Sequence, residues 1–488
     1  MVLRVRRLVY GLGLASLMGQ FCLAQVQGAE TRYRSLVSPP LLAQTTCQAQ
    51  LTQKIDRLLQ QSDLATSSWG IVIQNAQTQA VLYEYNGDRI LVPASNVKLL
   101  TTGAALLKLG ADYQFKTPVY GRGQAPYLSQ LVIVGQGDPT VTTDSLKAVI
   151  TQLQNQGITQ IQELILVDKV SPSERLPGTW EWEDLVYDYA PPVNQAILNE
   201  NAVTLTVKSA GLNQPTQLFW SEAIAGQQWQ VINQSRVVAE NPRGLAVRRE
   251  LATHRLIITG ELVPNTEEAI GLAIPDPSGY FLDTFKALLQ AQKIMVNRLK
   301  VVTELPLDKD WVKLAEISSP KLGDIIAKIN QESNNLHAEA LLNVLKNQDT
   351  NQKEPILSSF PNTNLSPFRL KDGSGLSRQN LISPRLFTQV LFTLKNNVTY
   401  RDSLATSGQT GTLKNRFLNT PLANNLQGKT GTLTGVSSLS GYLTTATQQP
   451  IIFSLLVNNS LLPGSNLRSA FDQILLWTAQ DEDCVQSF

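Results

Sequence analysis

The predicted secondary structure changes in character twice along the 488 residues of the sequence, and this arrangement constrains the possible fold most strongly. Before Gly110, a helical pattern is followed by "WGIVIQNAQTQAVLYEYN", two β-rich runs around a polar turn. Residues 111–314 are short β-rich runs between Gly, Pro and Asn turns, with one helical stretch over 279–292. Two helices, two strands and an amphipathic helix follow. We therefore predict one α/β domain, formed by both ends of the chain and split by a long insertion.

The N-terminus has the pattern of a secretory signal. Arg4, Arg6 and Arg7 precede a short apolar run that ends in small residues, with a candidate cleavage site after Ala24. The alternative is a membrane anchor, but glycines interrupt the run and it is shorter than the roughly 20 apolar residues of a span. No other stretch approaches a membrane span. We expect a mature chain that works outside the cytoplasm, soluble or peripheral.

Two cysteines remain once the signal is removed, Cys47 and Cys484, at opposite ends of the chain. In an oxidising compartment they could form one disulfide that ties the two ends together. The alternative is a pair of free thiols. The disulfide requires that the first and last segments of the mature chain lie side by side.

Charge and histidine content exclude several classes of function. The chain has 41 basic and 39 acidic residues, so no field of one sign suggests a nucleic-acid partner. The only histidines are His254 and His337, and no ligand cluster supports a metal site. A packing or capping role is the default for both histidines, which argues against a Ser-His-Asp enzyme. We expect no metal and no cofactor.

The stretch "LVPASNVKLLTTGAALLKLG" contains Ser95 and Lys98 at a predicted helix start. Residues i and i+3 share a helix face, so the lysine amine can reach the serine hydroxyl. A lysine acts as a base only where burial or a neighbouring cation lowers its pKa. The helix after Ser95 is apolar on nearly every face, which would bury Lys98. A serine nucleophile beside its own base is the resulting hypothesis.

Three similar patterns are interpreted as structural or accidental. Ser318 and Lys321 repeat the spacing at another predicted helix start, where Ser319 is a candidate N-cap and the helix is amphipathic. A segment beginning at Glu339 matches the E-x-x-L-N pattern of class A β-lactamases inside a predicted helix, which we interpret as chance. "GQTGTLKNRF" has Gln409 where a cation would be needed.

Three further polar clusters accompany Ser95 and Lys98. "QESNNLHAEA" places Ser333 and Asn335 in a loop between two helices. "LQGKTGTLTGVSSLSGYL" opens a strand with Lys429 to Thr432, where a cation and hydroxyls flank a glycine that allows close approach of a substrate. "LKDGSGLSRQN" is a glycine-rich turn with Arg378, a possible carboxylate clamp.

With these motifs in the order S-x-x-K, S-x-N and K-T-G, the sequence resembles the penicilloyl-serine transferase superfamily. It resembles most the class C low-molecular-mass penicillin-binding proteins, which are D-alanyl-D-alanine carboxypeptidases and endopeptidases. That family carries inserted domains between the first two motifs, and here about 230 residues separate Lys98 from Ser333. The shared stretches include "GQGDPT", "WEW", "LNENAVTL" and "DGSGLSRQN". The resemblance implies an antiparallel sheet flanked by helices.

The resemblance also implies a role for each motif residue. Ser95 would be the acylated nucleophile and Lys98 its base, while Ser333 would pass a proton to the leaving amine. Asn335 would orient both the substrate amide and the Lys98 side chain. Lys429 and Thr430 would bind the terminal carboxylate of the substrate. The backbone N–H groups of Ser95 and Thr432, which follows Gly431, would form the oxyanion hole. Such an acyl transfer needs neither metal nor imidazole. Lys429 is expected to help lower the pKa of Lys98.

Some members of the family have a pocket for a diaminopimelate side chain. The matching residues here would be Arg378, Ser374 and Asp168, although Ser173 stands where those members have an aromatic residue.

The predicted protein is an exported, periplasmic or wall-associated serine DD-peptidase that acts on peptidoglycan peptides and is acylated by β-lactams. The alternative is a catalytically weak binding protein on the same scaffold. The predicted division is signal 1–24, flexible lead-in 25–46, peptidase domain 47–110 and 315–488, and β-rich insertion 111–314 with an inner module at about 200–265.

Overall fold

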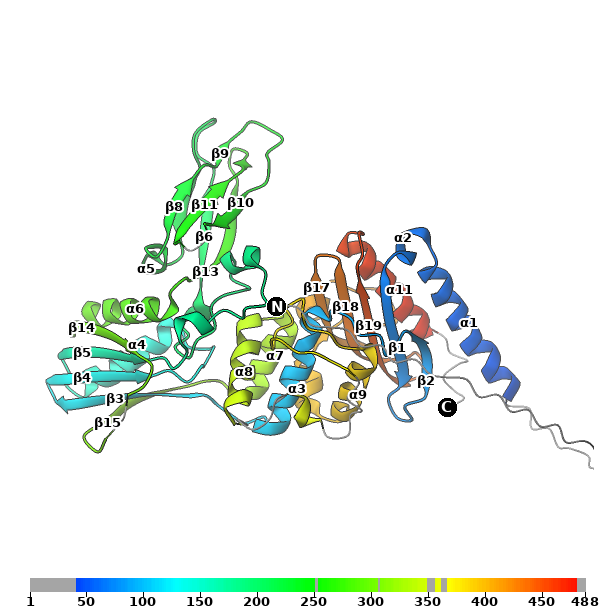
Figure 1. Ribbon diagram of the computed structural model, residues 1–488, viewed down its shortest axis with the longest axis horizontal. Helices are drawn as coiled ribbons and strands as arrows, with labels where there is room; N and C mark the ends of the chain where they lie inside the picture. The colour runs from blue at the N-terminus through cyan, green and yellow to red at the C-terminus, as the bar shows by residue number, and fades with distance from the viewer. Residues whose placement is uncertain (1–40, 251–252, 306–307, 349–355, 361–366, 481–488) are drawn as a thin grey trace, which may run out of the picture. The chain divides into compact units, whose positions relative to one another are not determined.

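A computed structural model describes residues 41–250, 253–305, 308–348, 356–360 and 367–480. Its largest sheet has six antiparallel strands that come from both ends of the chain (Figure 1). In sheet order they are β16 (Ala405–Thr406), β17 (Leu426–Leu433), β18 (Val436–Thr444), β19 (Pro450–Asn458), β1 (Ser68–Asn75) and β2 (Val81–Tyr85). The predicted hairpin is the β1–β2 pair, and the two predicted C-terminal strands are β18 and β19.

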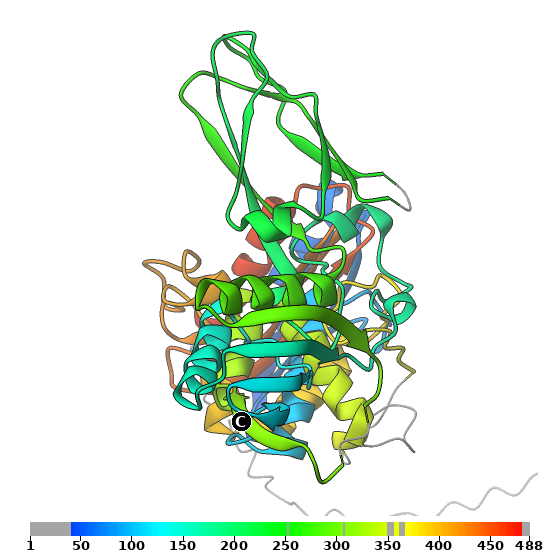
Figure 2. The same cartoon turned by 90° about the vertical axis from the view of Figure 1, so that its left-hand side faces the viewer.

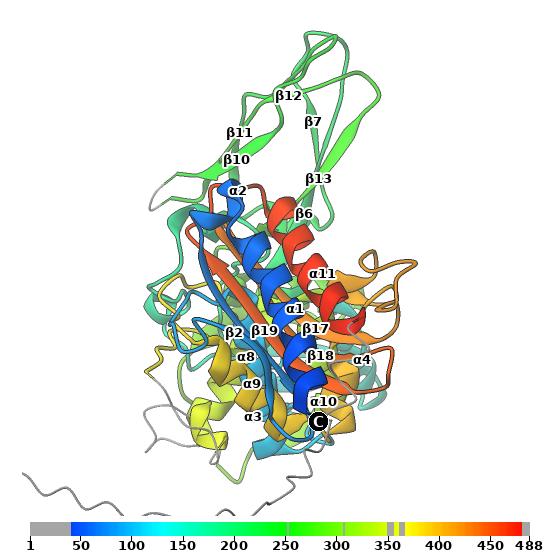
Figure 3. The same ribbon diagram turned by 90° about the vertical axis from the view of Figure 1, so that its right-hand side faces the viewer.

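Helices cover both faces of this sheet. The helices on one face are α3 (Val97–Leu109), α7 (Leu322–Glu332), α8 (Asn335–Gln348), α9 (Pro384–Leu394) and α10 (Val398–Ser403). The other face carries α1 (Leu41–Leu59) and α11 (Gly464–Gln480), which Figure 3 shows in front of the strands. Consequently β18 and β19 are buried along nearly their whole length, as expected for strands covered on two sides. The predicted fold class, an antiparallel sheet flanked by helices, is confirmed.

The segment between α3 and α7 contains a second, five-stranded sheet. Its order is β14 (Met295–Val302), β5 (Gln160–Val167), β4 (Tyr127–Val134), β3 (Lys116–Gln124) and β15 (Val312–Ser318). Helices α4 (Thr143–Asn155) and α6 (Pro277–Ala291) pack on it through a shared apolar core. The sequence reading recognised α6 but missed α4, whose buried positions Leu146, Val149, Ile150 and Leu153 have helical spacing. This part is therefore α/β rather than purely β-rich.

A smaller β module stands on this second sheet, and Figure 2 shows its narrow strands at the top. One of its sheets has the order β13 (Glu267–Ala273), β6 (Ala202–Lys208), β7 (Gln217–Trp220). The others are β10 (Ala246–Arg249), β11 (Arg255–Thr259), β8 (Gln230–Asn233), and the pair β12 (Glu261–Leu262), β9 (Arg236–Val237). Short helical pieces complete the chain: α2 (Ser62–Ala65), α5 (Ala223–Gly226), η1 (Ala94–Asn96), η2 (Pro172–Glu174), η3 (Trp182–Val186), η4 (Asn199–Asn201), η5 (Leu357–Ser359) and η6 (Gly411–Leu413).

Several predictions concern residues at the limits of the described chain. Helix α1 begins at Leu41, so the helical backbone starts before the predicted end of the lead-in. The predicted signal and most of the lead-in lie outside the described residues. Cys484 lies outside them too, so the two alternatives for Cys47 and Cys484, a disulfide or two free thiols, both stay open. Within the described ranges, no helix is both long enough and apolar enough to cross a membrane.

Candidate active site

Ser95 and Lys98 lie at the junction between η1 and α3, as the sequence predicted. Ser95 is half-buried in the short 3₁₀ turn, and Lys98 is in the first turn of α3 with none of its surface exposed. The Lys98 Nζ lies 3.1 Å from Ser95 Oγ. It also donates to Asn335 Oδ1 at 2.6 Å and to the Ser374 carbonyl at 2.6 Å. All three of these hydrogen-bond partners of the buried amine are oxygens.

Two glycines allow the backbone to close tightly around Ser95. A Cβ on Gly431 in β17 would lie 2.9 Å from Ser95 N, and a Cβ on Gly375 would lie 1.9 Å from the Ala94 carbonyl oxygen. Ala94 itself has a φ of 48°, in the left-handed region that non-glycine residues rarely adopt. Such strained positions persist only where the surroundings over-determine them. The strand that carries the K-T-G motif and the glycine-rich turn therefore both pack closely against Ala94, the residue before Ser95.

The second and third motifs meet the first at the same place. Ser333 caps α7 in a left-handed conformation with a φ of 64°, and Lys429 Nζ donates to its Oγ at 2.9 Å. Asn335 begins α8 and reaches Lys98 through its Oδ1, while its Nδ2 donates to the Tyr189 carbonyl at 2.7 Å. Three segments far apart in the sequence thus bring two amines and two hydroxyls together.

The electrostatics of the two lysines follow from burial. Complete burial lowers the pKa of Lys98 to about 7, although the carboxylates of Asp372 and Glu339 act in the opposite direction. Burial, followed by the charge of Lys98, holds the pKa of Lys429 well below its usual range. Burial is the largest cause for both lysines, and the repulsion between the two amines disfavours charging both at once.

The glycine-rich turn that contacts Lys98 is held by two carboxylates. Glu339 Oε1 accepts from the N–H groups of Gly373 and Ser374 at 3.0 and 2.8 Å. Asp372 accepts from the Trp180 indole at 2.9 Å and from two further N–H groups of the turn. Burial, with the charge of Asp372, raises the pKa of Glu339 to about 7. The sequence reading dismissed Glu339 as accidental, because its partners lie on another segment.

A cavity of about 390 Å³ opens beside Ser95, Ser333 and Asn335. Part of its wall belongs to the segment between α3 and α7, which contributes Glu181, Asp184 and Tyr189. Arg378 lines it as well, and its Nε lies 2.9 Å from Glu181 Oε1. Sequence reasoning missed Glu181 and Asp184, although Glu181 is the middle residue of the quoted "WEW" stretch and Asp184 follows that stretch by two positions.

The chain matches the D-Ala-D-Ala carboxypeptidase 3 (S13) family over residues 51–481. It belongs to this family. The D-alanyl-D-alanine carboxypeptidase of Actinomadura sp. (strain R39) is 28% identical over 86% of this chain and 85% of its own length. The penicillin-sensitive carboxypeptidase A of Dictyostelium discoideum is 27% identical over 84% and 87%.

Solved structures support the same fold. The crystal structure of penicillin binding protein 4 from Haemophilus influenzae superposes with a TM-score of 0.76 at 24% identity, covering 86% of this chain and 97% of that one. Another structure of that protein, complexed with a β-lactam, has a TM-score of 0.71 at 23% identity. The predicted resemblance is confirmed, and the predicted serine D-Ala-D-Ala carboxypeptidase activity is the activity of the S13 family.

The structure places two predicted pocket residues elsewhere. Asp168 is buried, and its carboxylate accepts hydrogen bonds from Arg175, Asn194 and Ser278 at 3.1, 2.8 and 2.7 Å. The Ser374 side chain is fully buried, and only its carbonyl meets Lys98. Neither residue lines the cavity beside Ser95. Asp168 is satisfied within its own fold by these three donors, and the Ser374 hydroxyl accepts from the Leu376 N–H at 3.4 Å.

The structure also places Ser318 and Lys321, which repeat the S-x-x-K spacing. Ser318 ends strand β15, and Lys321 lies at the surface, where its Nζ is 2.7 Å from Asp112 Oδ1. Ser319 is not the predicted N-cap, because α7 begins at Leu322 and the Ser319 Oγ accepts from the Phe115 N–H at 2.9 Å. The near copy of the third motif lies beside the real one, since Thr430 Oγ1 donates to Thr412 Oγ1 at 2.8 Å.

Proposed function

We propose that this S13 protein releases the terminal D-alanine of peptidoglycan stem peptides through an acyl-enzyme on Ser95. The observation that carries the proposal is the contact between Lys98 Nζ and Ser95 Oγ at 3.1 Å, made by an amine whose pKa is about 7. Near neutral pH a large fraction of Lys98 is uncharged and can accept a proton. A base with a pKa near the working pH is the efficient choice for general-base catalysis.

The reaction would proceed in two halves. Lys98 takes the proton of Ser95 Oγ while that oxygen attacks the carbonyl carbon of the scissile amide. The N–H groups of Ser95 and Thr432 stabilise the negative charge on the carbonyl oxygen. The C–N bond then breaks, and Ser333, in contact with Lys429, delivers a proton to the departing nitrogen of D-alanine. The proton that Lys98 took from Ser95 replaces the one that Ser333 gives up, so Lys98 is neutral again. In the second half water attacks the ester carbonyl and loses a proton to Lys98; the bond to Ser95 Oγ then breaks, Lys98 returns the proton to that oxygen, and the shortened peptide leaves.

Lys429 and Thr430 would bind the terminal carboxylate of the substrate. Burial next to another amine holds the pKa of Lys429 well below its usual range. A substrate carboxylate would supply a counter-charge and raise that pKa. Recognition of the carboxylate is therefore coupled to charging of Lys429. Substrates that lack a free C-terminal carboxylate would forfeit this interaction.

Specificity for the third residue of the stem peptide would depend on the wall of the cavity beside Ser95. Glu181 and Asp184 provide negative charge and Arg378 provides positive charge. A side chain that carries both an amine and a carboxylate, such as diaminopimelate, is complementary to this pair of signs. In this proposal Glu181 and Asp184 replace the predicted Asp168. Cleavage of cross-links to such a side chain is part of the same proposal.

The proposal includes the location and organisation of the protein. Export to the periplasm or wall follows from the signal-like N-terminus and from the location of the substrate. Residues 47–110 and 315–488 would form the peptidase domain, since both contribute strands to the six-stranded sheet. Residues 111–314 would then be the insertion, which contributes Glu181 and Asp184 to the cavity. β-Lactams would acylate Ser95 covalently.

The test uses the two serines that share the same spacing. The parent protein and a Ser318→Ala variant should release D-alanine from diacetyl-Lys-D-Ala-D-Ala, and a Ser95→Ala variant should not. Mass spectrometry should find bound penicillin on the peptide that contains Ser95. Penicillin labelling of Ser95 without D-alanine release would indicate a binding protein instead. D-alanine release by Ser95→Ala at the parental rate would refute the site assignment.

A further inference from the structure

Asn334 stands between Ser333 and Asn335, the two residues of its turn that have a role in the proposed reaction. Both ends of its side-chain amide are used. The Oδ1 atom accepts from the His337 N–H at 3.0 Å and so caps helix α8. The Nδ2 atom donates to Glu200 Oε2 at 2.7 Å. The Asn334 side chain is therefore fixed from two sides, by its own helix and by Glu200.

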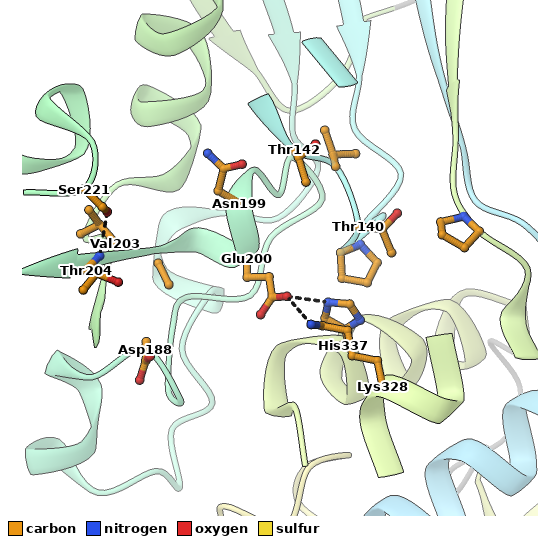
Figure 4. Close-up of a pocket in the computed structure, with 14 residues that line it drawn as sticks. Thr140, Thr142, Asp188, Asn199, Glu200, Val203, Thr204, Ser221, Lys328 and His337 are labelled. Atoms are coloured by element: carbon orange, nitrogen blue, oxygen red, sulfur yellow. Dashed lines mark hydrogen bonds and ion pairs between the residues drawn. The ribbon is translucent and has the colours of Figure 1, made fainter. Parts of the chain in front are cut away.

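Glu200 contacts both helices that flank this turn, although it precedes Asn334 by 134 positions in the chain. Its Oε1 lies 3.2 Å from Lys328 Nζ on helix α7 and 3.4 Å from His337 Nε2 on helix α8 (Figure 4). Helix α7 ends just before Ser333 and helix α8 begins just after Asn334. One carboxylate thus joins the two helices at the point where the chain passes from one to the other.

The charge of Glu200 strengthens this contact. Although burial acts in the opposite direction, His337, Lys328 and Asn334 lower the pKa of Glu200 to about 2. A negative charge at the start of a helix such as α8 interacts favourably with the helix dipole. Hydrogen bonds to an ionised acceptor are stronger than those between neutral groups. The contact between Glu200 and Asn334 is therefore a charge-assisted one.

The backbone that presents Glu200 is strained. Asn199, Glu200 and Asn201 have φ values of 48°, 56° and 52°, in the left-handed region that glutamate rarely adopts. Side chains of the two asparagines hold this loop, with Asn199 Nδ2 donating to Tyr280 Oη at 2.7 Å and Asn201 Nδ2 to the Pro192 carbonyl at 2.9 Å. Strained backbone persists only where its surroundings over-determine it. Here the result is a carboxylate that reaches the turn from another segment.

Ser333 depends on this support more than Asn335 does. Asn335 has two contacts of its own, since its Oδ1 accepts from Lys98 at 2.6 Å and its Nδ2 donates to the Tyr189 carbonyl at 2.7 Å. Ser333 has a left-handed backbone with a φ of 64°, and its hydroxyl accepts from Lys429 at 2.9 Å. Loss of the contact with Asn334 would therefore displace Ser333 first.

We propose that Glu200 is a positioning residue for proton transfer by Ser333. Through Asn334 it holds the Ser333 hydroxyl where that group can protonate the leaving amine. Glu200 does not line the cavity beside Ser95, so it acts through Asn334 and not on the substrate. The inference rests on the role of Ser333 in the proposed function. It makes the segment between α3 and α7 necessary for the chemical step as well as for substrate recognition.

The test compares two substrates that differ at the leaving atom. One is diacetyl-Lys-D-Ala-D-Ala, whose leaving nitrogen must take up a proton. The other is the matching thioester, in which thiolactate replaces the terminal D-alanine, and its thiolate leaves without a proton. Both acylate Ser95 by the same attack, assisted by Lys98. The measured quantity is kcat/KM, which reports the steps up to the acyl-enzyme.

Two single variants break the contact. Glu200→Ala removes the acceptor, and Asn334→Asp removes the donor but keeps an oxygen to cap α8. In both, kcat/KM for the peptide should fall by about tenfold or more, because a small displacement of a reacting group is costly. The thioester should be cleaved at close to the parental rate. Combining Glu200→Gln with Asn334→Asp exchanges the amide and the carboxylate, which restores the hydrogen bond, and peptide cleavage should recover toward the parental value.

The control variant removes a carboxylate that shares a partner with Glu200. Glu332 contacts Lys328 at 2.9 Å from an exposed position, and Glu332→Ala should leave kcat/KM for both substrates unchanged. An equal fall for both substrates in Glu200→Ala would overturn the proposal, because it would indicate a general structural effect. Undiminished peptide cleavage in Glu200→Ala, or an exchanged pair that recovers nothing, would overturn it as well.

Failure of the proposed function would be seen separately, as a parent protein that releases no D-alanine. The same variants would then be compared in the acylation of Ser95 by penicillin, in which the lactam nitrogen takes up the proton. Slower acylation in Glu200→Ala, with recovery in the exchanged pair, would support the positioning role. Acylation at the parental rate in Glu200→Ala would refute it.

Discussion

Lys98 Nζ and Ser95 Oγ lie 3.1 Å apart, and the amine has no exposed surface. The proposed nucleophile therefore adjoins the proposed base, whose pKa is lowered by burial. Lys321 and Ser318 have the same spacing in sequence, but Lys321 is exposed and paired with Asp112. The difference between the two pairs is burial, and it makes the catalytic assignment testable.

Replacing Lys98 should abolish acylation. Lys98→Ala removes the base, and loss of general-base catalysis typically costs about 10²- to 10⁴-fold in rate. The measurement is the second-order rate constant for penicillin acylation of Ser95. The matched variant Lys321→Ala should acylate at the parental rate. A fall of similar size in both variants would show that the effect is structural rather than chemical.

The acylation rate should depend on pH through Lys98. Below its pKa of about 7 the amine carries a proton and cannot accept one, so the rate should fall as the pH decreases through 7. Above that pKa the amine is neutral, and the rate should reach a plateau. The profile would be measured over about two pH units on either side of the midpoint. A rate independent of pH across this range would exclude Lys98 as the proton acceptor.

Glu339 should affect the pH at which the acylation rate is half of its maximum. Its carboxylate raises the pKa of Lys98, so Glu339→Gln should move the midpoint to lower pH by less than about one unit. A glutamine oxygen can still accept the two N–H groups of the turn. Glu339→Ala would leave them unsatisfied, at a cost of about 1–3 kcal/mol in the free energy of unfolding. An upward shift of the midpoint in Glu339→Gln would contradict this account.

Asp168 should matter for stability and not for substrate choice. Asp168→Asn leaves the buried guanidinium of Arg175 without its main counter-charge, and breaking a buried pair costs about 3–5 kcal/mol. Asp276 contacts the same arginine from an exposed position, so Asp276→Asn should cost less than about 1 kcal/mol. Both would be measured by denaturant unfolding. If folded Asp168→Asn protein had a changed KM for substrates that differ in this side chain, Asp168 would belong to the binding site after all.

The helices and strands that flank the site were largely predictable. The hairpin β1–β2, the strands β18 and β19, and helix α8 follow from hydrophobic periodicity, which depends only on neighbouring residues. Helix α4 was missed although its apolar positions 146, 149, 150 and 153 have the i, i+3, i+4, i+7 spacing of an amphipathic helix. The N-cap at Ser319 was wrong because a long-range hydrogen bond to Phe115 outweighed the local capping preference.

The sequence by itself determined the three motifs, their order and the apolar helix that buries Lys98. These features are local, since a helix places Ser95 and Lys98 on one face wherever it packs. Only the tertiary structure decided that Glu339 and Asp372 hold the turn over Lys98, that Glu181 and Arg378 pair in the cavity, and that Asp168 does not reach it. Hydrogen bonds between distant segments leave no pattern in the sequence, because each partner separately looks like an ordinary polar residue.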